Sequence, residues 1–220
     1  MSSNKAKAAQ AVPCRLAALP RGRHKLDREA VRDSQRGRLL GAMLELVGSQ
    51  GYAATSVPQV VAAAKASRNA FYEHFKDKED CFLTMCAEEA ANFSDEVLAG
   101  AVTAGDWTEA ARLAVRRALN WWQARPLLAR AYLVEIPLVG PRAVESRSLA
   151  YAPFEQLLLE AAKWARIANP ALRPLPARAP HFLITGITEL IADLVRQGRG
   201  DEVASLEEDL VNIVISVLGN

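Results

Sequence analysis

The sequence predicts an all-α protein in which a small N-terminal domain of three helices precedes a larger helical domain. Apolar residues recur at steps of one, three and four between residues 39 and 47, as in a helix with one buried face. Residues that typically end or begin helices stand at the matching places, with Gly51 after the first helix and Ser67 before the third. Two further apolar stripes with helical spacing run through residues 182–194 and 206–217.

The composition is that of a globular protein with a sizeable core. The chain has 220 residues, of which 50% are hydrophobic and 24% are charged. No segment approaches the ~20 consecutive apolar residues that a membrane-spanning helix needs, so we expect no membrane contact. The three cysteines, Cys14, Cys81 and Cys86, are odd in number and have no metal-ligand spacing. This usage is typical of a reducing compartment, and it predicts a cytoplasmic protein.

Positive charge is concentrated in the first part of the chain. The overall charge is +2, but residues 1–80 hold 14 Lys and Arg against 8 Asp and Glu, and residues 1–26 contain no acidic residue. Residues 1–26 also lack a sustained hydrophobic period, which predicts a basic flexible arm. Such an arm fits nucleic-acid binding through phosphates, a transit peptide or a solvated tail, and composition does not choose among these three.

Residues 27–80 contain three helices, two of them short. The first begins at about Asp27. The second occupies about 56–64, with Thr55 or Ser56 as its N-cap and Pro58 in its first turn. The third runs from Ser67 through residue 75, and Asp77 caps a long fourth helix from about residue 78. Helices of two turns are unstable alone and must pack on their neighbours.

The third helix has two faces of different character. Phe71 and Phe75 are four residues apart and point inward, whereas Arg68, Asn69 and Tyr72 lie on the opposite face. Arginine and asparagine in the first turn of a short exposed helix suit the edges of bases, because arginine pairs with guanine and asparagine with adenine. The sequence therefore predicts a helix that enters the DNA major groove.

Residues 49–83, SQGYAATSVPQVVAAAKASRNAFYEHFKDKEDCFL, resemble the DNA-binding domain of the TetR family of transcriptional regulators. The resemblance covers about 50 residues from Ser34. It is carried by the ordered set of the Gly51-Tyr52 cap, Thr55, the Ser67-Arg68 pair, the aromatic run of residues 71–75 and the Lys78-Glu79 pair. The sequence departs from the family pattern at Pro58, at Lys65 in the turn where glycine is usual, and at Ala70 where a hydroxyl residue is common.

A helix-turn-helix places the N-terminal residues of its recognition helix against base edges, which predicts base contacts from Ser67, Arg68 and Asn69. The resemblance implies phosphate contacts from Thr55, Tyr72, His74 and Lys78. A half-buried position for Tyr72 and a packing role for His74 remain open alternatives. Minor-groove contact from the arm, through Arg21, Arg23 and Lys25, stands beside the alternative of a solvated tail.

Residues 81–220 are predicted to bind an effector and to dimerise. We expect helices near 78–100, 107–124, 126–138, 142–168, 179–197 and 203–218. The resemblance implies a homodimer through the last two helices, since one recognition helix contacts too few base pairs to be selective. Aromatic residues gathered in this domain predict a pocket for an apolar or aromatic small molecule, although an ordinary core is the competing explanation. The expected pocket residues are Trp121, Trp122, Tyr132, Glu135, Tyr151, Phe154, His181 and Phe182.

These features predict a sequence-specific regulator of transcription that acts on double-stranded DNA. Repression of a palindromic operator, relieved by the effector, is the outcome that the resemblance implies. The alternative is a helical interaction protein or ligand carrier that no longer binds DNA. The sequence has no phosphate loop, no nucleophile elbow and no histidine pair at metal spacing, so we expect no enzyme, no cofactor and no metal site.

Overall fold

The computed structural model describes residues 28–101 and 104–219. This part of the chain consists of helices and connecting turns without a strand, which confirms the predicted all-α fold. In chain order the elements are α1 (Arg28–Gln50), α2 (Val57–Ala63), α3 (Arg68–His74), α4 (Lys78–Ala101), α5 (Trp107–Gln123), α6 (Pro126–Ala129), the π-helical segment η1 (Arg130–Glu135), α7 (Ile136–Val139), α8 (Pro141–Leu149), α9 (Ala152–Ala168), α10 (Ala179–Arg196), the 3-10 segment η2 (Gly200–Leu206) and α11 (Glu207–Leu218).

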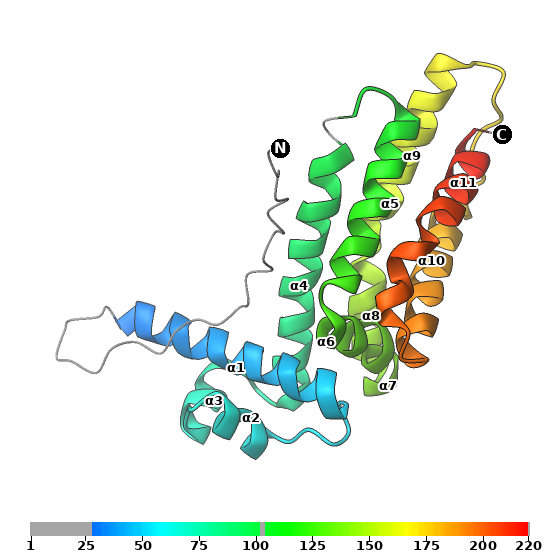
Figure 1. Ribbon diagram of the computed structural model, residues 1–220. Coiled ribbons are helices and arrows are strands. Elements are labelled where there is room, and N and C mark those ends of the chain that lie inside the picture. The colour runs from blue at the N-terminus through cyan, green and yellow to red at the C-terminus, as the bar shows by residue number, and fades with distance from the viewer. Residues whose placement is uncertain (1–27, 102–103, 220) are drawn as a thin grey trace, which may run out of the picture.

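Helices α1, α2 and α3 form a small unit, residues 28–77, which we call the head. In Figure 1, α1 lies across the lower end of α4, and α2 and α3 lie below α1. The apolar side of α1 supplies Leu39, Met43 and Val47 to the core, and α3 contributes Phe71. All four side chains have no measurable exposure. Because α2 and α3 are only two turns long, this shared core is what holds them in place.

The ends of these helices follow the sequence prediction. Gly51 has φ +90°, a left-handed conformation in which glycine carries little strain, and it ends α1. The amide and hydroxyl of Ser56 donate hydrogen bonds to Gln59 Oε1 at 2.8 and 2.7 Å at the start of α2. The Ser67 hydroxyl accepts from the Ala70 amide at 3.1 Å, which caps α3 as expected.

The remaining helices form a bundle, residues 78–219. Helices α4, α5, α9, α10 and α11 run side by side along its length, and the short elements α6, η1, α7 and α8 close the end next to the head (Figure 1). Helix α4 belongs to the bundle but begins directly after the head. In the two described ranges, none of the helices combines the length and the apolar character that crossing a membrane requires.

Two of the predicted helices are interrupted. The helix expected over 142–168 breaks at Ala150–Tyr151, because Pro153 has no amide proton for the Leu149 carbonyl. The helix expected over 126–138 widens into η1, and Pro137 likewise cannot donate to Leu133. The last helix begins as a 3-10 segment and becomes α-helical only at Glu207.

Candidate nucleic-acid interface and apolar cavity

Helix α3 presents its polar side to solvent. Arg68, Asn69 and Glu73 are exposed, and Tyr72 is 52% exposed, whereas Phe71 on the other side of the helix is completely buried. Arg68 forms no ion pair with any carboxylate in residues 28–101 and 104–219, so its guanidinium remains available. The N-terminal turn of α3 therefore has the exposure that contact with base edges requires.

The turn between α2 and α3 is held by hydrogen bonds that the sequence did not indicate. Lys65 has φ +51° and occupies the left-handed position where glycine is usual. The Lys65 amide donates to Ala62 O at 3.2 Å and the Ala66 amide to Val61 O at 2.9 Å, which together make a Schellman cap. Arg38 Nη1 reaches over from α1 and donates to Ala64 O at 3.1 Å. These bonds offset the roughly 1 kcal/mol strain of a left-handed lysine.

Two residues expected to touch phosphate instead have their polar groups used inside the head. Thr55 is 3% exposed, and its hydroxyl donates to Gly51 O at 2.8 Å. Lys78 Nζ donates to Tyr52 O and to Thr55 O, both at 3.0 Å, and lies 3.8 Å from the centroid of the Tyr52 ring. Burial lowers the pKa of Lys78. Lys78 thus fastens the α1–α2 connection to the start of α4, and the Thr55 hydroxyl bonds within that connection. The phosphate contacts of these two residues stay predictions.

The other predicted DNA contacts divide into three cases. Tyr72 is exposed on the same face as Arg68, and its phosphate contact stays a prediction. His74 has a buried Nε2 with no hydrogen-bond partner in the described structure, and its pKa is lowered by burial and by the nearby Arg32, so it suits a packing role better than a phosphate contact. The arm residues Arg21, Arg23 and Lys25 lie outside the described residues.

A link between the head and the bundle centres on Glu135 of η1. Glu135 is buried, with 9% of the residue exposed, and its Oε2 accepts a hydrogen bond from the Tyr52 amide at 2.9 Å. A Cβ added to Gly51 would lie 3.2 Å from Glu135 Oε1, so the left-handed glycine also makes room for the carboxylate. Arg130, at the other end of η1, donates from Nη1 to Ser49 O at 3.2 Å. The segment η1 thus holds the chain where α1 ends.

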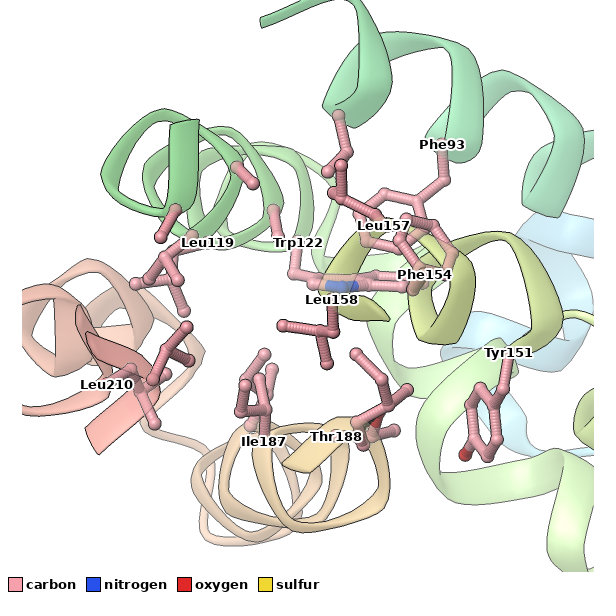
Figure 2. A pocket seen from close by; sticks show the side chains of 18 of the residues that line it. Phe93, Leu119, Trp122, Tyr151, Phe154, Leu157, Leu158, Ile187, Thr188 and Leu210 are labelled. Carbon is pink, nitrogen blue, oxygen red and sulfur yellow. Dashed lines mark hydrogen bonds between the residues drawn. The ribbon is translucent and has the colours of Figure 1, made fainter. Parts of the chain in front are cut away.

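The centre of the bundle contains a large apolar cavity. Its empty space is about 1020 Å³, measured to include the opening to solvent. Side chains from α4, α5, α9, α10 and α11 surround it, with Leu158 of α9 near the middle (Figure 2). Tyr132 and Leu133 of η1 complete the wall. The main polar atoms on the lining side chains are the hydroxyls of Thr188 and of the tyrosines and the indole nitrogen of Trp122, so the cavity suits an apolar molecule.

Four of the eight predicted pocket residues line this cavity, namely Trp122, Tyr132, Tyr151 and Phe154. The others do not. Trp121 is next to Trp122 on α5 and so points to another side, where the Arg125 guanidinium carbon lies 3.6 Å from its ring centroid. Glu135 binds the head, and His181 pairs with Glu155 on the surface at 2.8 Å. Phe182 is 75% exposed.

The sequence reasoning missed the small residues that leave the space empty. Ala110, Ala114 and Ala118 recur every four residues along one side of α5 and line the cavity. Phe93 of α4 also lines it, with its ring centroid 4.9 Å from that of Trp122. A row of alanines facing large aromatic residues was the available signal, because short side chains on one wall leave room that the opposite wall does not fill.

Two of the three cysteines, Cys81 and Cys86, lie in the described part of the chain, and Cys14 lies outside it. Both thiols are buried, and burial raises the pKa of Cys81 to about 12 and also raises the pKa of Cys86. A thiol with such a pKa is a poor nucleophile at neutral pH. Across residues 28–101 and 104–219, His, Cys, Asp and Glu side chains do not gather in groups of three that could hold a metal ion.

Comparison with known proteins identifies the head. Residues 39–85 match the family model described as bacterial regulatory proteins, tetR family. The match spans the second half of α1, the whole of α2 and α3, and the start of α4. No curated protein matches the chain.

Solved structures resemble the whole fold at low sequence identity. The fatty acid degradation regulator FadR from Bacillus halodurans superimposes with a TM-score of 0.75 at 18% identity, over 84% of this chain and 95% of that one. FadR from Bacillus subtilis, in complex with stearoyl-CoA, gives 0.73 at 16% identity, over 83% and 98%. A tetR-family regulatory protein from Rhodococcus RHA1 gives 0.67 at 17% identity, over 84% and 97%. At these identities the likeness concerns the fold.

Proposed function

This chain belongs, through its N-terminal domain, to the bacterial tetR family of DNA-binding transcriptional regulators, and we propose that it represses transcription from a palindromic operator until a small apolar effector releases it. The observation that carries the proposal is the exposed polar side of α3, with Arg68 and Asn69 free beside a buried Phe71. We assign residues 27–80 to DNA binding and residues 81–220 to effector binding and dimerisation.

The proposed contacts follow from exposure. Arg68 and Asn69 contact base edges in the major groove, with Ser67 at the cap beside them, and Tyr72 contacts a phosphate on the same side of α3. The backbone amides in the first turns of α3 and α4 that the caps leave unbonded are candidate anion donors beside the side chains of Thr55 and Lys78, because the first amides of a helix have no partner within the helix.

The effector site is the apolar cavity. FadR of Bacillus subtilis, which this chain resembles in fold, was solved with stearoyl-CoA, a molecule with a long acyl chain. The cavity described above is surrounded by aliphatic and aromatic side chains, a lining that suits such a chain. These two facts favour a flexible apolar chain over a planar aromatic effector.

Gel-shift titration with the chain's own upstream region tests the proposal. We expect a retarded complex that contains two copies of the protein and that dissociates when a suitable apolar ligand is added. A complex that no ligand disturbs contradicts the effector part of the proposal. Failure to bind any fragment at low salt favours the alternative, a helical interaction protein without DNA binding.

Dimerisation is proposed through the outer faces of α10 and α11. Three large apolar side chains are exposed on these faces: Phe182 is 75% exposed, Leu190 48% and Ile213 46%. The surface beside Gly186 on α10 is also open, since a Cβ added there would meet no atom within 4 Å. Large apolar side chains exposed together on neighbouring helices are typical of interfaces. The opposite side of α10 lines the cavity through Ile187 and Ile191, so one helix separates the effector from the proposed partner.

Phe182→Asp is expected to weaken the dimer by about two orders of magnitude, because the charge enters the proposed interface once from each copy. Size-exclusion chromatography with light scattering over a range of concentrations measures the change. Ile167→Asp is the matched control, since Ile167 is 80% exposed on α9. Equal effects of the two substitutions, or none from Phe182→Asp, would place the interface elsewhere.

A further inference from the structure

A second cavity lies beside the apolar one, and its lining is more polar. Its empty space is about 710 Å³, again measured to include the opening to solvent. It shares Ala90, Tyr132 and Ala150 with the apolar cavity, so the two spaces have a common wall. The side chains of Ser94, Ser146 and Arg147 also line it.

Arg147 is the one charged side chain among the described residues that line either cavity. Neither lining contains an aspartate, a glutamate, a lysine or a histidine. No carboxylate in the described parts of the chain forms an ion pair with Arg147, although its neighbour on α8, Arg142, pairs with Glu79 at 3.6 Å. A half-buried cation without a counter-ion favours an anion at that place.

The position of the Arg147 guanidinium is fixed by an aromatic side chain of the first cavity. Arg147 Nε donates a hydrogen bond to the Tyr151 hydroxyl at 2.7 Å, and Tyr151 is buried and lines the apolar cavity. Tyr151 stands at the edge of that cavity in Figure 2. A guanidinium has five N–H groups in a planar fork. The bond to Tyr151 uses one of them and leaves the paired donors of the fork free for a carboxylate or phosphate.

We infer that the effector is an anionic amphiphile whose apolar chain fills the large cavity and whose negatively charged headgroup pairs with Arg147 in the adjoining one. The inference rests on the effector site proposed above and adds the chemistry of the headgroup. A neutral lipid or a purely apolar molecule leaves the Arg147 charge unpaired, whereas an anion beside the Tyr151 hydroxyl pairs it. A free carboxylate and the phosphates of a coenzyme A ester share this chemistry.

The test compares three ligands with the same twelve-carbon chain. Binding of dodecanoate, dodecanol and dodecanoyl-CoA is measured by isothermal titration calorimetry on the full chain without DNA. The two anions are kept below their micellar concentrations and dodecanol below its solubility limit. We expect wild type to bind dodecanoate or dodecanoyl-CoA at least tenfold more tightly than dodecanol. Arg147→Gln is expected to remove that preference and to leave the affinity for dodecanol within twofold. Arg147→Lys keeps the charge and is expected to keep part of the preference.

Matched controls separate the headgroup from general damage. Arg142→Gln, on the same helix, is expected to change none of the three affinities, and the melting temperature of each variant reports its folding. Equal affinities of wild type for the three ligands, a preference that persists in Arg147→Gln, or no binding of any ligand overturns the inference. A preference confined to one of the two anions supports the inference and shows whether the headgroup is a free carboxylate or a coenzyme A ester. Gel shift with the same ligands then tests the proposed function separately. A ligand that binds the protein without releasing DNA contradicts the proposed function and leaves the inference about the headgroup intact.

Discussion

Replacing Arg68 with alanine is expected to weaken binding to the specific DNA site by about 1–3 kcal/mol for each half-site, because a bidentate arginine–guanine contact is lost. The proposed dimer carries the change twice, so the expected loss is roughly 30-fold to 20,000-fold. The side chain is exposed and has no ion pair in the described structure, so the fold is expected to remain intact. Asn69→Ala is expected to act in the same direction, at an adenine.

Fluorescence anisotropy with the operator and with a scrambled duplex measures this effect. Affinity for the scrambled duplex is expected to fall far less, because phosphate contacts supply non-specific binding. Arg166→Ala, which removes another exposed arginine, on α9, is the matched control for lost charge and is expected to change neither affinity. If Arg68→Ala lowers both affinities equally, Arg68 contacts the backbone and not a base. If it lowers neither, α3 is not the recognition helix.

Replacing Glu135 with alanine is expected to have the second large effect. The half-buried Tyr52 amide then loses its acceptor, and hydrogen bonds to charged groups contribute about 1.5–3 kcal/mol to stability. The same element, η1, lines the cavity with Tyr132 and Leu133 and holds the end of α1 through Arg130 and Glu135. A ligand that moves η1 therefore changes the position of the head through this link. In Glu135→Ala, which lacks this link, we expect the effector to bind the protein but to cause little release of DNA.

Two measurements check the Glu135 prediction. Denaturant unfolding reports the loss of stability, and DNA affinity with and without saturating effector reports the coupling, whose usual size is about 1–3 kcal/mol. Glu135→Gln keeps an oxygen that can accept from the Tyr52 amide and is expected to fall between alanine and wild type. Glu145→Ala, an exposed carboxylate on α8, is the control. A full effector response in Glu135→Ala would mean that coupling runs through α4 and not through η1.

Local sequence signals were sufficient for the head. The stops and caps at Gly51, Ser56, Ser67 and Asp77 are read from residue type alone, since each acts on backbone groups within three or four residues of itself. The division of α3 into a Phe71 side and an Arg68 side follows from helical periodicity. For the same reason the all-α fold and most helix boundaries of the bundle were predictable.

What the sequence alone determined about this protein is its helices and the polar side of α3. Only the tertiary structure decided that Thr55 and Lys78 bond inside the head, that Glu135 joins η1 to Tyr52, and that Phe182 faces solvent. Periodicity gives the side of its own helix on which a residue lies, but not which neighbour covers that side. A partner 83 residues away along the chain, as for Glu135 and Tyr52, depends on how the helices pack, and helical spacing carries no information about it.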